Sequence, residues 1–205
     1  MKLYTSVGPN PRVVKMFLAE KGLDIPMTEV DIRGGENRQP PYNTSVNPAG
    51  QSPALELDGG GVVTEITAIC EYLEERHPSP PLIGATPEER AETRMWARRV
   101  DLKVCEPMAN GFRYGEGLKM FENRLRCLPE ASAGLKAVAK DGEAWLEEHF
   151  KGPWLAGERF TLADILLFAF IEFGAVVGQP LDPGFTKIND WLARVRARPS
   201  AAASA

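Results

Sequence analysis

The first 76 residues alternate between short strand-like runs and segments with helical periodicity. Residues 2–5 form one such run, and residues 27–32 form a second in which Thr28, Val30 and Ile32 alternate with charged neighbours. The segment between these runs has a helical pattern. Two strands that flank a helix at this spacing predict a parallel pair joined by a right-handed crossover.

The helix between these strands has recognisable signals at both ends. Asn10 is a suitable N-cap, Pro11 is favourable at the first helical position, and Gly22 is a typical C-terminal stop. One face of this predicted helix is apolar, formed by Val13, Val14, Phe17 and Leu18.

A second group of elements completes an α/β domain. Residues 34–50 are polar and rich in helix breakers, which predicts an irregular helix. Two short apolar runs at residues 54–57 and 62–63 follow, joined by a glycine-rich turn, and predict a hairpin. A helix then begins near Glu65, and its apolar stripe has amphipathic spacing: Ile66, Ile69, Cys70 and Leu73.

The pattern changes after residue 76. Residues 77–81 contain three prolines, which cannot continue a helix and favour a stiff, extended linker. Thr86 is then a plausible N-cap, followed by Pro87 and two glutamates that suit the start of a helix. We therefore expect an α/β domain over residues 1–76, a linker over 77–86 and an all-helical domain over 87–205.

The helical part contains a second specific signal. Thr161 is placed to cap a helix, and Asp164, three residues later, is placed to reach back in a capping box. Phe160 and Ile165 occupy the positions of a hydrophobic staple. The helix that follows is apolar on all sides over residues 165–171, which predicts that it is buried.

Composition narrows the possible functions. The 205 residues carry a formal net charge of −4, which does not indicate a nucleic-acid partner. No run of 18 apolar residues predicts a membrane span, and the first residues lack the apolar core of a signal peptide. The three cysteines, Cys70, Cys105 and Cys127, are widely spaced. They fit a reducing cytosol and indicate neither a disulfide framework nor a zinc site.

Candidate chemistry is concentrated where the hairpin meets the next helix. Pro53 opens the first hairpin strand, a position where its missing N–H is not needed. Backbone groups of the preceding residue are then available to an extended ligand. The start of the helix near Glu65 offers free N–H groups and a positive dipole end, which suit a carboxylate. These features together predict a receptor for a small extended peptide with an acidic end.

This arrangement resembles the glutathione S-transferase family, in its cytosolic, bacterial type. The resemblance covers nearly the whole chain: the first strand and helix, the run at residues 47–53, the helix at Glu65, the linker and the late capping box. It implies a thioredoxin-like N-terminal domain followed by an all-helical domain. It also implies a cis peptide bond before Pro53 and a cytoplasmic homodimer that acts in detoxification, with no metal.

The resemblance implies a set of glutathione-binding residues. Arg38 would bind the glycyl carboxylate, Ser52 would present its backbone to the cysteinyl part, and Glu65 would meet the γ-glutamyl ammonium. Ile66 stands where many relatives have a hydroxyl residue, so only its backbone N–H and the neighbouring Thr67 remain. The full set is Arg38, Gln51, Ser52, Pro53, Glu65, Ile66 and Thr67.

The position that stabilises the thiolate departs from the common pattern. Relatives often have a tyrosine in the first strand, where this chain has Thr5, or a serine or cysteine in the turn after it. The Pro9–Asn10 pair is similar to the turn of nu-class relatives, in which an asparagine amide donates to sulfur. Asn10 is therefore the first candidate, Ser6 the second and Thr5 the third. A plain helix N-cap is the alternative role for Asn10.

The resemblance places an acceptor pocket in residues 105–114. Its candidates are Met108, Phe112, Arg113 and Tyr114, with packing inside the helical domain as an equal alternative. The implied function is a glutathione transferase that acts on small electrophiles. The alternatives are a glutathione-dependent reductase, an ether- or halide-cleaving enzyme, or a non-catalytic binding protein with this fold.

Overall fold

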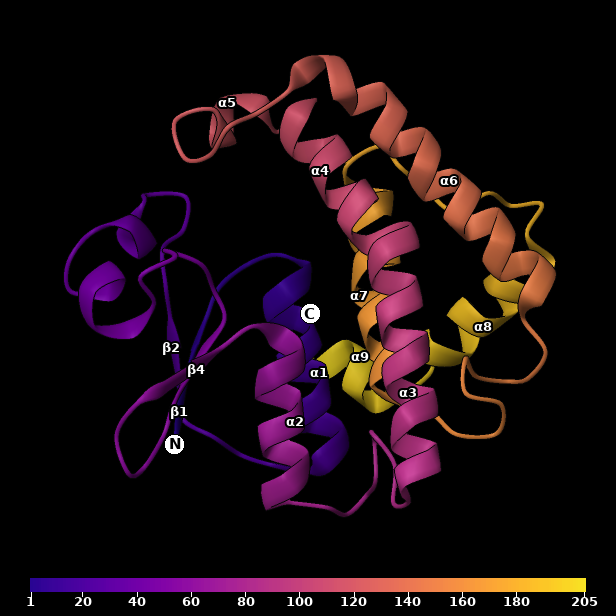
Figure 1. Cartoon of the computed structure of the whole chain (residues 1–205), viewed down its shortest axis with the longest axis horizontal. Coiled ribbons are helices and arrows are strands. Elements are labelled where there is room, and N and C mark those ends of the chain that lie inside the picture. The colour runs from indigo at the N-terminus through magenta and orange to yellow at the C-terminus, as the bar shows by residue number, and fades with distance from the viewer. The chain divides into compact units, whose positions relative to one another are not determined.

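A computed structural model describes all residues from Met1 to Ala205. The chain forms two compact units (Figure 1). The first contains Met1–Leu82 together with Pro199–Ala205, and the second contains Ile83–Arg198.

The first unit is built on a four-stranded mixed sheet. The strand order is β2-β1-β3-β4; β1 and β2 are parallel, and the β1–β3 and β3–β4 pairs are antiparallel. Two packed helices lie on the same side of this sheet (Figure 1). The predicted βαβ–ββα order and thioredoxin-like fold are therefore confirmed. The elements are β1 (Lys2–Thr5), α1 (Pro9–Lys21), β2 (Met27–Glu29), β3 (Ala54–Glu56), β4 (Val62–Thr64) and α2 (Ile66–Arg76).

The two faces of the sheet have different environments. Leu3 and Leu55 lie opposite each other on β1 and β3, and both are fully buried. Tyr4 points to the other face, because successive strand residues alternate. Its ring packs edge-on against Tyr42, with centroids 5.9 Å apart. Tyr42 begins η2 (Tyr42–Val46), one of two short helical turns; the other is η1 (Glu36–Arg38).

Two predicted boundaries are wrong. Helix α1 begins at Pro9 rather than Pro11, and its N-cap is Gly8 at φ 113° rather than Asn10. Both prolines suit the first turn, so the sequence pattern did not distinguish them.

Strand β2 ends at Glu29 rather than at residue 32. Val30 still donates its N–H to the Thr5 carbonyl at 2.8 Å. The Ile32 N–H then donates to the Val30 carbonyl at 2.9 Å, so the chain turns away from the sheet.

A buried ion pair holds the end of the first unit. Lys21, the last residue of α1, pairs with Glu74 on α2, and both side chains are almost completely buried. The Lys21 ammonium also donates to the carbonyls of His77 at 2.7 Å and Pro80 at 2.6 Å. Glu74 in turn accepts the Leu82 N–H at 3.3 Å. This pair therefore fixes residues 77–82 to the two helices.

The end of the chain returns to the first unit. Helix α9 (Pro199–Ala203) packs against α1, and the Arg12 guanidinium donates to the Ala201 carbonyl at 3.2 Å. Ser200 donates its hydroxyl to Glu20. Residues 199–205, which the sequence pattern places in the helical domain, pack against α1 in the structure.

The named elements of the second unit are all helices, and two isolated β-bridges lie in the loop before α7. Helix α7 is its most buried element, with every residue from Leu162 to Ile171 buried, as the sequence predicted. No helix of the chain is both long enough and apolar enough to cross a membrane. The elements are α3 (Pro87–Val100), η3 (Asp101–Cys105), α4 (Glu106–Tyr114), α5 (Leu118–Phe121), η4 (Pro129–Ala131), α6 (Ser132–His149), α7 (Leu162–Val176) and α8 (Thr186–Arg196).

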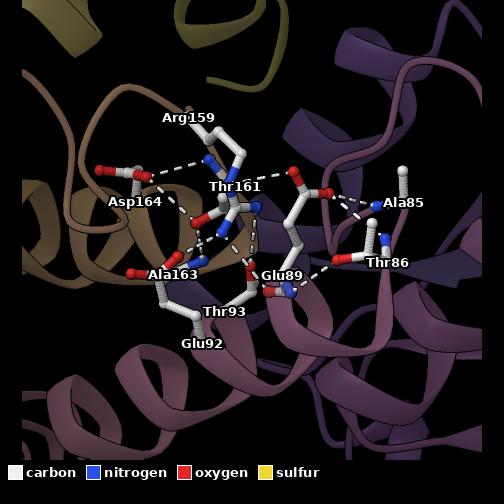
Figure 2. A network of polar contacts seen from close by, with 9 residues as sticks. All are labelled: Ala85, Thr86, Glu89, Glu92, Thr93, Arg159, Thr161, Ala163 and Asp164. Atoms are coloured by element: carbon white, nitrogen blue, oxygen red, sulfur yellow. Dashed lines mark hydrogen bonds and ion pairs between the residues drawn. The ribbon is translucent and has the colours of Figure 1, made fainter.

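The predicted capping box at Thr161 is present, and the predicted N-cap at Thr86 forms a second capping box; Figure 2 shows both. Thr86 accepts the Glu89 N–H at the start of α3. Thr161 and Asp164 form the second box at the start of α7. Arg159 connects the two helix starts by ion pairing with Glu92 of α3 at 2.6 Å (Figure 2).

Asp164 does more than close its capping box. Its carboxylate accepts hydrogen bonds from the Leu155 N–H and the Trp191 indole N–H, each at 2.9 Å, and from the Thr161 N–H at 3.0 Å. Its side chain is fully buried, and burial raises the carboxyl pKa to about 6 despite these donors. Asp164 therefore joins the loop before α7 to helix α8.

Candidate functional site

The sheet register brings the ends of three strands together. Tyr4 pairs with Ala54, and Ala54 pairs with Thr64. Continuing each register by one residue places Thr5 beside Pro53, and Pro53 beside Glu65. Residues that are distant in sequence therefore form a row at one end of the sheet.

This row has a cis peptide bond at its centre and polar groups without partners around it. The Ser52–Pro53 bond is cis, as the family resemblance implies. The Ser52 hydroxyl is buried and has no hydrogen-bond partner, and its N–H donates to no group of the chain. The Thr5 hydroxyl is likewise buried and unpartnered. Buried polar groups normally have partners, so this cluster indicates a ligand site.

Glu65 has an unusual backbone conformation. It is the only residue other than glycine with a positive φ, at 68°. Such strain is concentrated at functional sites in proteins. Glu65 precedes α2 without capping it through its side chain, and that side chain is exposed. The first N–H groups of α2, at Ile66 and Thr67, therefore remain available to an anion. Ile66 is half-buried and Thr67 is exposed.

The start of α1 offers fewer backbone donors than an ordinary helix. Pro9 and Pro11 have no N–H, and the Arg12 N–H donates to the Gly8 carbonyl at 3.4 Å. Asn10 alone supplies an N–H among the first three helical residues, and its half-buried side chain adds an amide donor. Ser6 is buried, with its hydroxyl 3.4 Å from the Val7 carbonyl.

Tyr42 and Asn47 are two further residues of this region that were not predicted as site residues. The carbonyl of Gln51 accepts a hydrogen bond from the Tyr42 hydroxyl at 2.7 Å and another from the Asn47 amide at 2.9 Å. The Gln51 side chain itself is exposed. Arg38, the candidate for a carboxylate, lies half-buried at the end of η1.

The environment of the Tyr42 hydroxyl disfavours its ionised form. Loss of solvent, together with the nearby Tyr4 and Glu36, raises the pKa of Tyr42 to about 12. The hydroxyl therefore acts as a hydrogen-bond donor to Gln51 throughout the neutral pH range.

The predicted acceptor residues all lie on α4 of the second unit, in different environments. Met108 is fully buried, and its sulfur is close to Gly174, which favours the packing role. Phe112, Arg113 and Tyr114 are each partly exposed. Phe112 packs edge-on against Phe173, with centroids 5.2 Å apart. The Arg113 guanidinium donates to the Asn110 side chain at 2.8 Å.

Comparison with known proteins identifies the family. Residues 7–76 match the model of the glutathione S-transferase N-terminal domain, and residues 111–199 match that of the C-terminal domain. A maleylacetoacetate isomerase of Pseudomonas aeruginosa is 44% identical over 199 residues, which cover 94% of this chain and 91% of that protein.

Solved structures of similar proteins lead to the same family. The crystal structure of Gtt2 from Saccharomyces cerevisiae matches with a TM-score of 0.92 and 28% identity, covering 100% of both chains. A glutathione transferase homologue from Sulfitobacter, solved with bound glutathione, matches with a TM-score of 0.82 and 25% identity, covering 98% of this chain and 95% of that one. This chain belongs to the glutathione S-transferase family.

Proposed function

We propose that the first unit binds glutathione at the row formed by Thr5, Pro53 and Glu65, and activates its thiol for attack on small electrophiles. The observation that carries this proposal is the cluster of unpartnered polar groups around the cis peptide bond at Ser52. A peptide backbone lying along this strand end supplies an acceptor for the Ser52 N–H and a donor for its carbonyl.

The ends of the peptide have matching charges on the protein. Arg38 binds the glycyl carboxylate, and Gln51 lies along the peptide. Glu65 pairs with the γ-glutamyl ammonium, while the N–H groups of Ile66 and Thr67 bind the adjacent carboxylate.

In the proposed mechanism, Asn10 stabilises the thiolate. Its side-chain amide and its backbone N–H both donate to sulfur, with Ser6 and Thr5 as the further candidates. An amide is not a base, so the thiol proton leaves to water or buffer. The thiolate then forms a carbon–sulfur bond with the electrophile, which releases a leaving group or takes up a proton.

Calorimetric titration with reduced glutathione tests the proposal directly. We expect a dissociation constant in the millimolar range or tighter at neutral pH. Turnover of a generic aryl halide with glutathione would then establish transferase chemistry. No heat of binding at physiological glutathione concentrations would contradict the proposed site.

Glu65→Ala should weaken glutathione binding by about 1–3 kcal/mol, because a charge-assisted hydrogen bond is lost. This corresponds to an increase in dissociation constant of roughly 5- to 150-fold, measured by calorimetry. Glu75→Ala is the matched control, since Glu75 is an exposed glutamate on the same helix. If the Glu65 variant and the control bind glutathione equally well, Glu65 has only a structural role at the start of α2.

Asn10→Ala should lower kcat by on the order of tenfold while changing glutathione affinity much less, because the lost amide acts mainly on the thiolate. The pKa of bound glutathione, followed by thiolate absorbance, should rise in parallel. Asn10→Asp should raise that pKa further, since it places a carboxylate beside the sulfur. Unchanged kcat and thiol pKa in both variants would exclude this role for Asn10.

A second candidate function is glutathione-dependent isomerisation, favoured by the 44% identity to the Pseudomonas isomerase. The thiolate would add to a carbon–carbon double bond conjugated to a carbonyl. Rotation about the resulting single bond and loss of glutathione would then give the other geometric isomer. Isomerisation leaves the glutathione concentration unchanged, whereas conjugation consumes it, so following both distinguishes the two functions.

We further propose that the protein is a cytoplasmic homodimer acting in detoxification. The family resemblance supports this assembly, and the helical unit carries exposed apolar side chains at Met95, Leu102 and Val138. Sedimentation equilibrium of the purified protein tests it. A mass near 22.5 kDa at micromolar concentration would contradict the dimer.

A further inference from the structure

A hydrogen-bonded clamp lies next to the proposed glutathione site. Tyr42 and Asn47 both donate to the Gln51 carbonyl, at 2.7 and 2.9 Å. A carbonyl oxygen has two lone pairs, so these two donors saturate it. Both donor residues are buried, with 4% and 3% of their surface exposed. The Gln51 carbonyl is therefore fixed from one side by groups that solvent does not reach.

The clamp determines the direction of the next N–H group. The Gln51 carbonyl and the Ser52 N–H belong to one planar peptide unit and point in opposite directions in its trans form. Holding the carbonyl toward Tyr42 and Asn47 therefore directs the Ser52 N–H away from them. That N–H is the one that donates to no group of the chain.

The clamp is itself held in place. The Asn47 side-chain oxygen accepts the Ala49 N–H at 3.0 Å, and its carbonyl accepts the Gly50 N–H at 2.8 Å. Asn37 adds a side-chain hydrogen bond to the Gly50 carbonyl. The Tyr42 ring packs edge-on against Tyr4 of the central strand β1. The carbonyls of Gly50 and Gln51 are therefore held by Asn37 of η1 and Tyr42 of η2, and Tyr42 in turn packs against the sheet.

We propose that Tyr42 and Asn47 are positioning residues for glutathione, acting through the Gln51 carbonyl to orient the Ser52 N–H toward the peptide. This inference rests on the proposed function, because it assigns the Ser52 N–H to the bound glutathione. Both residues act through the Gln51 carbonyl, to which their side chains donate. Their effect is to preorganise a backbone donor that would otherwise rotate with its peptide plane.

Tyr42→Phe tests the clamp, since it removes one hydroxyl and keeps the packed ring. We expect the KM and the dissociation constant for glutathione to rise about three- to tenfold. The KM for the electrophile and kcat at saturating glutathione should stay within about twofold, because the reacting atoms are not touched. If Tyr42 contributed only to stability, Tyr42→Phe would lower the melting temperature but would not raise the KM for glutathione at unchanged kcat.

Tyr4→Phe is a closely matched control. Tyr4 belongs to the same aromatic pair, and its hydroxyl donates to Glu56 at 2.9 Å rather than to Gln51. This variant should bind glutathione like the parent protein. Equal weakening in both variants would show that the aromatic pair acts only through general stability, and unchanged affinity in Tyr42→Phe would overturn the clamp.

A measurement on the unmodified protein gives an independent test. Glutathione should slow hydrogen exchange of the Ser52 amide, and it should do so less in Tyr42→Phe. If the parent protein binds no glutathione, the proposed function itself fails. If it binds glutathione while the Ser52 amide is unaffected, the positioning inference fails, together with the contact between the Ser52 N–H and glutathione, but glutathione binding itself stands.

Discussion

Replacing Lys21 with methionine should destabilise the protein by about 3–5 kcal/mol, because it removes the buried positive charge that pairs with the buried Glu74 carboxylate. The same change removes the donor to the carbonyls of His77 and Pro80. Methionine has a similar length and no charge, so lost packing is a minor part of the effect. Denaturant unfolding, followed by circular dichroism, gives the free energy.

Two further variants isolate the ion pair. Lys15→Met is the control on the same helix, since Lys15 makes only an exposed contact with the Ala205 carbonyl at 3.4 Å. It should change stability by no more than about 0.5 kcal/mol. The double variant Lys21→Met with Glu74→Leu should be more stable than Lys21→Met alone, because no buried charge remains. A double variant that is less stable than Lys21→Met would contradict a dominant electrostatic role.

Asp164→Ala should destabilise the helical unit by on the order of 4 kcal/mol. The change leaves the N–H groups of Leu155, Thr161 and Trp191 without an acceptor in a buried site, and each such loss costs about 1–3 kcal/mol. Thermal and denaturant unfolding measure the effect. Asp190→Ala, at an exposed position on α8, is the control and should be close to neutral.

The pH dependence of stability provides a second test of Asp164. Burial raises its folded pKa to about 6, whereas an aspartate in an unfolded chain titrates near 3.9. The folded state thus holds a proton that the unfolded state has released, so this group's contribution to stability falls as pH rises from about 4 to about 6. Asp164→Asn lacks that contribution. The stability difference between the parent protein and this variant should narrow over that range, and a widening difference would assign the carboxyl a lowered pKa.

Features encoded by local patterns were predictable from the sequence. The N-cap at Thr86 and the capping box at Thr161 follow from signals within four residues, and the burial of α7 follows from its composition. The cis bond before Pro53 could be predicted only from the family resemblance, because no local sequence pattern distinguishes it from a trans bond.

Features that depend on tertiary contacts were not predictable. The prediction that Asn10 is the N-cap was wrong, because the helix begins at Pro9 and its N-cap is Gly8, at φ 113°. The strain at Glu65 has no sequence signal. The Tyr42 clamp joins a tyrosine in an irregular polar segment to a carbonyl nine residues later, which neither helical nor strand periodicity describes.

The position of α9 has a consequence for how the protein is made. The α/β unit is discontinuous, because residues 199–205 complete the surface around α1. A ribosome releases the chain from the N-terminus, so this unit is complete only after the whole helical unit has been synthesised. A fragment that ends at Leu82 lacks the Ala201 carbonyl and the Ser200 hydroxyl, which hydrogen-bond with Arg12 and Glu20. When the α/β unit is produced alone, a short linker that restores residues 199–205 to α1 should therefore stabilise it.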